Sequence, residues 1–407
     1  MRAHFLQSAV PVKALHVVLA VAAIGLATPS ATGAGQISSD AVATAGQLPG
    51  PVPGFVGEII QGTYTIGERT GAWQALPVYV TSDGSATHAT SAGAPVAGLN
   101  HDGVSDMIIS TGSGSFRCSG ALLYDGQSIL TAAHCVTDNS GNINASNVSA
   151  TWELSGGTVT ASSSTIQVHP SYNGSVTNGY DVAVINFSSP IDAAVPRYGI
   201  FRDGGLVELG PEIIKVGYGR SGFGETGATT GSGTKRYGKN EWEDDGLGDE
   251  GVGGITNDST QVTYDFDSNY RNLDDDGGKD ATDDEDHDGF NFHFGRAVNL
   301  GFGDDEVMSG AGDSGSPSFI LDDGEYRIAG VASYILRLER SAGPPGDRSS
   351  DVDDTLNSSW GEFAVDSRLA EPAMSAFVDS AVIPEPATLA LLAAGGLGVL
   401  LRRQRRN

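Results

Sequence analysis

Positive charge and cysteine are both scarce in this chain. Its 407 residues include 23 lysines and arginines but 50 aspartates and glutamates, which gives a formal net charge of −27. Because so acidic a surface repels the phosphates of nucleic acid and of anionic lipid, we expect neither as a partner of the folded protein. The only two cysteines form no CxxC pair, which excludes the common redox and zinc motifs.

Long apolar runs are few, and the first lies at the start of the chain. Residues 14–27 are largely apolar, follow a short basic segment and lead into small residues, which is the order of a secretory signal peptide. We therefore expect a signal peptidase to remove residues 1–34, with a buried core helix as the alternative. Export places Cys118 and Cys135 in an oxidising compartment, where they can form one disulfide.

The second apolar run lies at the end of the chain. Residues 387–401 carry no charge, follow Pro384-Glu385-Pro386 and precede four arginines. As a helix the run reaches only about 22 Å, against about 30 Å for a bilayer core, so it is a marginal permanent anchor. The arrangement resembles the PEP-CTERM sorting signal. This resemblance implies that an exosortase of a Gram-negative, exopolysaccharide-producing bacterium recognises and removes the tail, residues 381–407. An ordinary tail anchor is the alternative.

Helix-forming residues do not dominate the rest of the sequence, which favours an all-β protein. Residues 35–95 have few charges and several prolines, so we expect a loosely packed N-terminal extension or propeptide, in which 78–81 could form a strand. Residues 96–380 contain short apolar runs bounded by turn residues, and one helix is expected at 372–379. The predicted strands include 106–109, 121–124, 128–131, 182–187, 213–216, 262–266, 318–321 and 327–334.

Three separate stretches contain the side chains of a nucleophilic site. Ser314 stands in a Gly-Asp-Ser-Gly turn, where small residues expose a hydroxyl and let backbone N–H groups point at an oxyanion. His134 follows a predicted strand, and a histidine can take a proton from a hydroxyl near neutral pH. Asp181 heads an apolar strand, where a carboxylate needs a donor such as a histidine N–H. Alone, each residue could equally belong to a plain loop, a structural contact or a turn.

In their order, histidine then aspartate then serine, these motifs resemble those of the chymotrypsin-like (trypsin-type) serine endopeptidases. The order differs from that of subtilisin-like and α/β-hydrolase sites, and a G-x-S-x-G motif is missing. The resemblance implies two six-stranded antiparallel Greek-key β-barrels over residues 96–380. It implies that Ser314 is the nucleophile, His134 the general base and Asp181 the group that orients the imidazole. The backbone N–H groups of Gly312 and Ser314 would form the oxyanion hole.

The same resemblance implies a disulfide between Cys118 and Cys135 and a pocket that selects the side chain before the scissile bond, the P1 residue. The pocket residues would be Met308, Ser333, Ile335 and Gly361. Met308 cannot pair with arginine or lysine, and Ile335 stands where a glycine would leave the pocket open. We therefore expect a small or apolar P1 residue.

Activation is less clearly encoded. Members of this family free an isoleucine or valine N-terminus that pairs with the aspartate before the nucleophile, which is Asp313 here. Val96 lies at a suitable distance along the chain, but no basic residue precedes it. Either another kind of protease activates the chain or Asp313 has a different partner.

A strongly acidic insertion, residues 241–289, separates Asp181 from Ser314. It contains 18 acidic residues and two basic ones. Part of it matches an oxygen-ligand calcium loop, with candidate ligands Asn272, Asp274, Asp276 and Asp283. No flanking helices are evident, so a solvated acidic loop is the alternative to Ca²⁺ binding. No cofactor is required by the expected chemistry.

Together these features predict a secreted serine endopeptidase that acts on protein or peptide substrates through an acyl-enzyme. It would work in the cell envelope or extracellular matrix and contact membranes only through its terminal signals. One alternative is a catalytically silent binding protein with the same fold and a calcium-binding acidic loop. An esterase with the same three residues is a third interpretation.

Overall fold

The computed structural model describes the following residues. They are 60–66, 69–76, 80–83, 96–248, 250–256, 259–267, 288–297, 299, 301–302, 305–341 and 349–383. The expected signal peptide, the candidate calcium ligands between 272 and 283, and the apolar run 387–401 lie outside these residues. No helix in the described part is long and apolar enough to cross a membrane.

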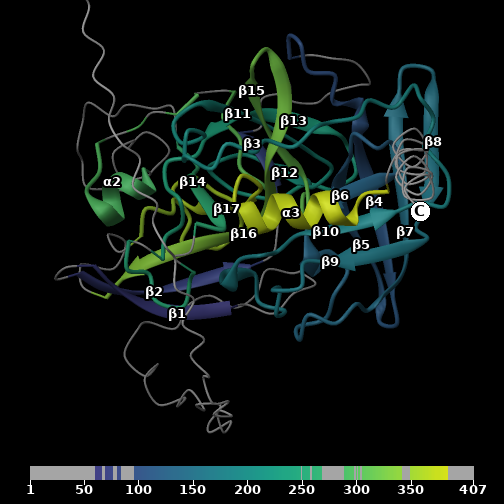
Figure 1. Ribbon diagram of the computed structural model, residues 1–407. Helices are drawn as coiled ribbons and strands as arrows, with labels where there is room; N and C mark the ends of the chain where they lie inside the picture. The colour runs from purple at the N-terminus through teal and green to yellow at the C-terminus, as the bar shows by residue number, and fades with distance from the viewer. Residues whose placement is uncertain are drawn as a thin grey trace, which may run out of the picture. The chain divides into compact units, whose positions relative to one another are not determined.

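Seven antiparallel strands form the first sheet, in the order β8-β7-β4-β5-β6-β10-β9 (Figure 1). These are β4 (Val104–Thr111), β5 (Gly114–Leu122), β6 (Ser128–Thr131), β7 (Ala145–Leu154), β8 (Gly157–Ser162), β9 (Thr165–Val168) and β10 (Ala183–Asn186). The expected turn at Asp125-Gly126 joins β5 to β6, and Gly126 has a φ of 66° there. Apolar side chains of these strands form one buried core, among them Met107, Leu122, Ile129, Trp152 and Ile185.

Eight strands form the second sheet. Its main path is β1-β2-β16-β15-β11-β13, and β17 pairs with both β16 and β14. The strands are β1 (Ile60–Ile66), β2 (Arg69–Leu76), β11 (Glu212–Gly217), β13 (Arg236–Glu241), β14 (Gln261–Asp265), β15 (Pro317–Asp322), β16 (Glu325–Arg340) and β17 (Phe363–Arg368). A small separate pair consists of β3 (Val80–Asp83) and β12 (Arg220–Gly222), which run parallel.

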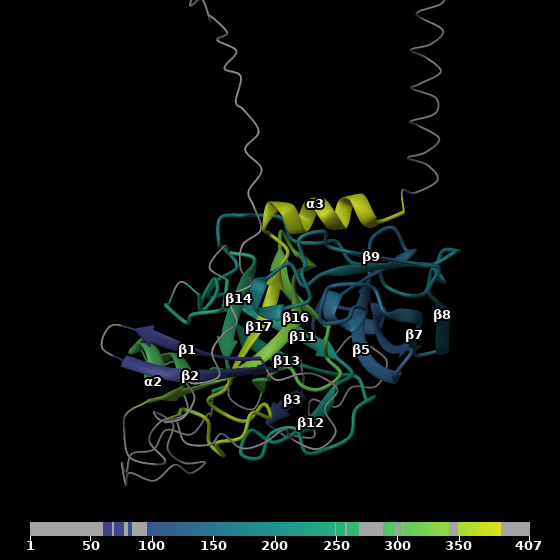
Figure 2. The same ribbon diagram turned by 90° about the horizontal axis from the view of Figure 1, so that it is seen from below.

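The N-terminal residues of the described chain are an integral part of the second sheet. β1 and β2 form a hairpin, and β2 pairs with residues 335–340 of β16 (Figure 2). Trp73 of β2 is only 2% exposed, and its indole N–H donates to Gly253 O at 2.9 Å. Residues 60–66 and 69–76 are therefore not loosely packed, which corrects that part of the expectation; that residues 35–95 are a propeptide stays a prediction. Any side chain at Gly62 would collide with the Trp73 ring, so a residue of low strand propensity stands there for packing reasons.

Helices are short. α3 (Pro372–Ala381) confirms the helix expected at 372–379; Glu371 caps it by accepting the Met374 N–H at 2.9 Å. α2 (Gly289–Phe294) was not expected. It follows the acidic insertion, where the Asp288 side chain accepts the Asn291 N–H at 2.7 Å.

The all-β class is thus confirmed, with the two sheets forming half-barrels. The strand numbers, seven and eight, differ from the expected six. In the second sheet the difference arises because the β1–β2 hairpin adds two strands to the edge of β16.

Candidate active site

His134 lies in a short turn that follows strand β6 of the first sheet. β6 ends at Thr131, and His134 is the middle residue of the 3-10 turn Ala133–Cys135. The expected disulfide joins Cys135 to Cys118 of β5. This cross-link ties the histidine turn to a second strand, while the His134 side chain stays 13% exposed. The imidazole is therefore held by a rigid backbone and remains accessible.

Asp181 is fully buried two residues before β10 and contacts His134 at two points. Asp181 Oδ2 lies 2.7 Å from His134 Nδ1, and Asp181 Oδ1 accepts the backbone N–H of His134 at 2.8 Å. Because an ionised carboxylate only accepts hydrogen bonds, this contact assigns the hydrogen to Nδ1. Nε2 is then left as the acceptor on the other side of the ring.

Ser333 supplies a further hydrogen bond to the same carboxylate. Its Oγ donates to Asp181 Oδ2 at 2.6 Å. Residues 332–334 of β16 face only two consecutive residues of β17, so Ser333 is the extra residue of a β-bulge, and the bulge redirects its side chain. The sequence predicted Ser333 as a pocket residue, whereas its hydroxyl contacts Asp181.

Ser314 contacts the other ring nitrogen of His134, Nε2. Its Oγ lies 2.6 Å from His134 Nε2, and the residue is 5% exposed. The Ser314 turn is anchored on both sheets, because Ser119 N–H donates to Ser314 O at 2.7 Å and Gly315 N–H donates to Ala332 O at 2.9 Å. A Cβ at Gly315 would collide with Thr131 Oγ1, which requires glycine at this position. The three predicted residues are therefore adjacent, in the order Asp181, His134, Ser314.

The two predicted oxyanion donors lie in the same turn. Gly312 has a φ of 104°, a conformation that favours glycine, and Ser119 Oγ donates to Gly312 O at 2.9 Å. Among the described residues, no hydrogen bond is made by the backbone N–H of Gly312 or of Ser314. Both donors are therefore available to a substrate oxygen, although their role as an oxyanion hole stays a prediction.

Asp313 finds its hydrogen-bond donors in neighbouring loops. Its buried carboxylate accepts the backbone N–H of Gly219 at 2.7 Å and that of Gly310 at 3.1 Å. Burial raises the pKa of Asp313 to about 7, and the Lys215 and Arg236 cations act in the opposite direction. In the described structure Asp313 is therefore hydrogen-bonded by backbone N–H groups, without a newly freed N-terminus.

Val96, the other residue of the activation hypothesis, lies in a tight turn. Its carbonyl accepts the Leu99 N–H at 3.0 Å, and its side chain packs against the core of the first sheet. Whether Val96 becomes an N-terminus stays a prediction.

Two of the predicted pocket residues share one apolar cluster. Met308 and Ile335 are fully buried in it together with Leu356 and Trp360. Gly361 has a φ of 83°, and a Cβ there would collide with the backbone of the preceding loop. Met308 and Ile335 therefore lie in an apolar part of the core, while the assignment of a specificity pocket stays a prediction.

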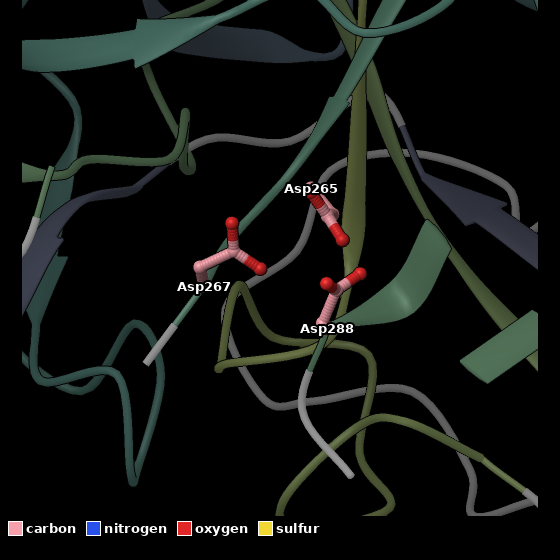
Figure 3. Close-up of side chains that lie close together, drawn as sticks. All are labelled: Asp265, Asp267 and Asp288. Carbon is pink, nitrogen blue, oxygen red and sulfur yellow. The ribbon is translucent and has the colours of Figure 1, made fainter. Parts of the chain in front are cut away.

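A group of carboxylates that the sequence did not single out lies within the acidic insertion, at the end of β14 and just before α2. Asp265, Asp267 and Asp288 are all buried, and their side chains point toward one another (Figure 3), with one oxygen of each within 4.8 Å of the others. Burial raises the pKa of Asp265 well above its usual range, with neighbouring acidic groups adding to the effect. Only the alternation of Asp265 and Asp267 at a strand end could have signalled it in sequence.

Comparisons with known proteins give two family matches. Residues 101–278 match the family model described as trypsin, and residues 382–406 match the PEP-CTERM protein-sorting motif. No curated protein matches the chain. A solved structure titled HL collagenase is similar at 17% identity and a TM-score of 0.44, over 73% of this chain and 98% of the other. The chain therefore carries a trypsin-family domain followed by a PEP-CTERM protein-sorting motif.

Proposed function

We propose that this protein is a serine endopeptidase that cleaves peptide bonds through an acyl-enzyme on Ser314. The observation that carries the proposal is the continuous contact from Asp181 Oδ2 to His134 Nδ1, at 2.7 Å, and from His134 Nε2 to Ser314 Oγ, at 2.6 Å. A trypsin-family domain supports a peptidase in general, and the order of these three groups supports nucleophilic catalysis in particular.

The proposed reaction has two halves. Ser314 Oγ attacks the substrate carbonyl while His134 Nε2 takes the hydroxyl proton, and the carbonyl oxygen becomes an oxyanion held by the N–H groups of Gly312 and Ser314. The C–N bond then breaks as His134 returns that proton to the leaving amine. A water attacks the resulting ester in the same way, so that the acid product leaves and Ser314 regains its proton. Asp181 stabilises the imidazolium formed in each half.

Labelling with a fluorophosphonate tests this proposal. We expect the full-length protein to form a covalent adduct, and Ser314→Ala to form none. Ser316→Ala is a matched control, because it removes a buried serine hydroxyl from the same turn without removing the proposed nucleophile. A correctly folded protein that does not label would favour the catalytically silent binding protein instead.

We propose a small or apolar P1 residue for its substrates. The buried Met308 and Ile335 support this preference, because neither could neutralise a charged side chain. A panel of peptides that differ only at P1 tests it, and best cleavage after arginine or lysine would contradict it.

The PEP-CTERM motif indicates sorting to the envelope of a Gram-negative bacterium and processing by an exosortase. We propose in addition that residues 1–34 are removed on export and that the enzyme acts in the envelope or matrix. Calcium binding by Asn272, Asp274, Asp276 and Asp283 likewise stays a prediction. Calorimetry with Ca²⁺ tests it, and the absence of heat would favour a solvated acidic loop.

A further inference from the structure

β16 has two edges, and the pairing of its neighbours shows which elements share each edge. β17 pairs with Val331 and again with Ile335. β15 also pairs with Val331, and β2 also pairs with Ile335. Because a strand offers only two edges, β15 and β2 must both lie on the edge opposite β17. Residues 332–334 separate the end of β15 pairing from the start of β2 pairing.

Residues 332–334 of β16 lie directly beside residues 311–316, the turn that contains Ser314 and that we call the nucleophile turn. Ala332 N–H donates to Ser316 O, and Ala332 O accepts the Gly315 N–H, both at 2.9 Å. A peptide that presents a carbonyl to Ser314 in an extended conformation would add itself to this edge as a strand. The residues on the amino side of its scissile bond would extend along β16 toward Ile335, which is about 10 Å beyond Ala332.

β2 already occupies the far end of that stretch, because it pairs with β16 from Ile335 onward. It pairs antiparallel with β16 from Gly71 opposite Arg340 to Leu76 opposite Ile335, so its carboxyl end is the end nearer to residues 332–334. An antiparallel substrate strand on the same edge would run in the same direction. β2 therefore has the polarity of the amino-terminal half of an extended substrate, and it would meet such a substrate from Ile335 onward.

β3 is linked through β12 to the other end of the nucleophile turn. Its Val80 pairs with Arg220 of β12, and the Arg220 N–H donates at 2.7 Å to the carbonyl of Ala311, the residue before Gly312. Only four peptide steps separate Leu76 from Val80, a reach of at most about 14 Å. The segment that contains β2 and β3 thus contacts the same two strands, β16 and β12, that hold the two ends of the nucleophile turn.

We propose that residues 69–76 and 80–83 lie where an extended substrate would lie on either side of Ser314, so that the chain's own N-terminal segment competes with peptide substrates. This inference rests on the proposed peptidase function. It predicts that a small substrate, which does not pair with β16, is hydrolysed normally. A peptide that extends along β16 is hydrolysed poorly until β2 dissociates from that strand.

Two substrates and a pair of matched variants test this. The substrates are a fluorogenic tetrapeptide amide with an apolar P1 residue and a single-residue ester of the same amino acid. Trp73→Phe removes the indole bond to Gly253 O that holds the β1–β2 hairpin. Trp152→Phe is the control, because it removes a similar indole bond, to Gly103 O, in the first sheet. We expect Trp73→Phe to raise kcat/KM for the tetrapeptide about tenfold and to leave ester hydrolysis unchanged. We expect Trp152→Phe to change the hydrolysis of neither substrate.

A reversible cross-link gives an independent measurement. Ala72 and Glu339 are paired residues of β2 and β16, so Ala72→Cys with Glu339→Cys can pin the hairpin in place. We expect the oxidised variant to lose at least tenfold in tetrapeptide hydrolysis but not in ester hydrolysis, and mild reduction to restore it. Wild-type protein treated in the same way controls for Cys118–Cys135.

The outcomes separate the inference from the function on which it rests. If the tetrapeptide is hydrolysed equally well by wild type, Trp73→Phe and the oxidised cross-linked variant while the ester is also hydrolysed, the inference is wrong. If neither substrate is hydrolysed and no variant labels with a fluorophosphonate, the proposed function itself fails.

Discussion

Ser333 donates its hydroxyl, at 2.6 Å, to the same Asp181 oxygen that contacts His134 Nδ1. The hydrogen bond reaches across the two sheets, because Asp181 precedes β10 of the first sheet and Ser333 belongs to β16 of the second. The carboxylate that orients the imidazole is therefore itself oriented by the strand along which a substrate would bind.

Removal of this hydroxyl should weaken catalysis without abolishing it. We expect Ser333→Ala to lower kcat/KM about tenfold, because a hydrogen bond to a charged group typically contributes about 1.5 kcal/mol. Asp181→Asn should lower it by roughly 10⁴-fold, since the amide favours the wrong imidazole tautomer. Steady-state kinetics on one peptide compares the two. Equal losses in both variants would contradict the supporting role of Ser333.

Loss of the disulfide should cost stability more than chemistry. Cys118 and Cys135 are 17 residues apart, and a closed loop of that length is worth about 3 kcal/mol of unfolding free energy in the chain-entropy account. We expect Cys118→Ala with Cys135→Ala to lose about that amount in urea unfolding, while the folded fraction still labels with fluorophosphonate. Unchanged unfolding would show that the cross-link does not restrict the unfolded chain.

Removal of the cation from the buried pair of Lys215 and Asp366 should lower the unfolding free energy much more than removal of the cation from an exposed pair. Lys215 Nζ lies 2.8 Å from an Asp366 oxygen, with both side chains at most 2% exposed. Lys215→Met leaves the buried Asp366 carboxylate without its counter-ion, with the Ser318 hydroxyl and the Trp242 indole N–H as its remaining donors, so we expect a loss of about 3–5 kcal/mol in unfolding free energy. Adding Asp366→Asn should recover part of it.

The exposed pair of Arg202 and Asp379 is the matched control for this comparison, and Arg202→Met should cost under about 1 kcal/mol. Similar losses from Lys215→Met and Arg202→Met would contradict the expected cost of an unpaired buried charge.

Stability should fall as the pH rises from mildly acidic to mildly basic. Burial raises the pKa of Glu306 from 4.5 to about 8, so the folded chain retains a proton that the unfolded chain loses first. Between these values the folded state binds more protons, and the unfolding free energy falls with pH by at most about 1.4 kcal/mol per unit. The raised pKa of Asp313, about 7, acts in the same direction.

We expect Glu306→Gln to flatten this dependence in thermal unfolding measured at pH 5, 6.5 and 8. The amide keeps one oxygen to accept the Asp267 N–H, which Glu306 Oε1 accepts at 2.9 Å. An equal slope in both proteins would show that Glu306 is ionised throughout.

The local sequence was sufficient to predict those site residues that stand in short, recognisable motifs. The glycines around Ser314, the turn before Cys135 and the apolar strand after Asp181 are short patterns, and their order along the chain resembles that of the trypsin-type endopeptidases, which implied the fold and the candidate site. The disulfide was equally determined, since the described domain has no third cysteine. The terminal signals are also linear patterns, which a single motif can report.

Tertiary structure decided what depends on pairing between distant segments. Ser333 contacts Asp181 only because a bulge in β16 redirects it, and Asp313 finds its donors in the loop at Gly219. The place of residues 60–66 and 69–76 was not predictable, because local strand propensity does not show that this hairpin pairs with the edge of a strand more than 250 residues away. Its stability comes from burial of Trp73 and from the edge of β16. Sequence therefore determined which side chains are available for chemistry, and long-range strand pairing decided what lies beside them.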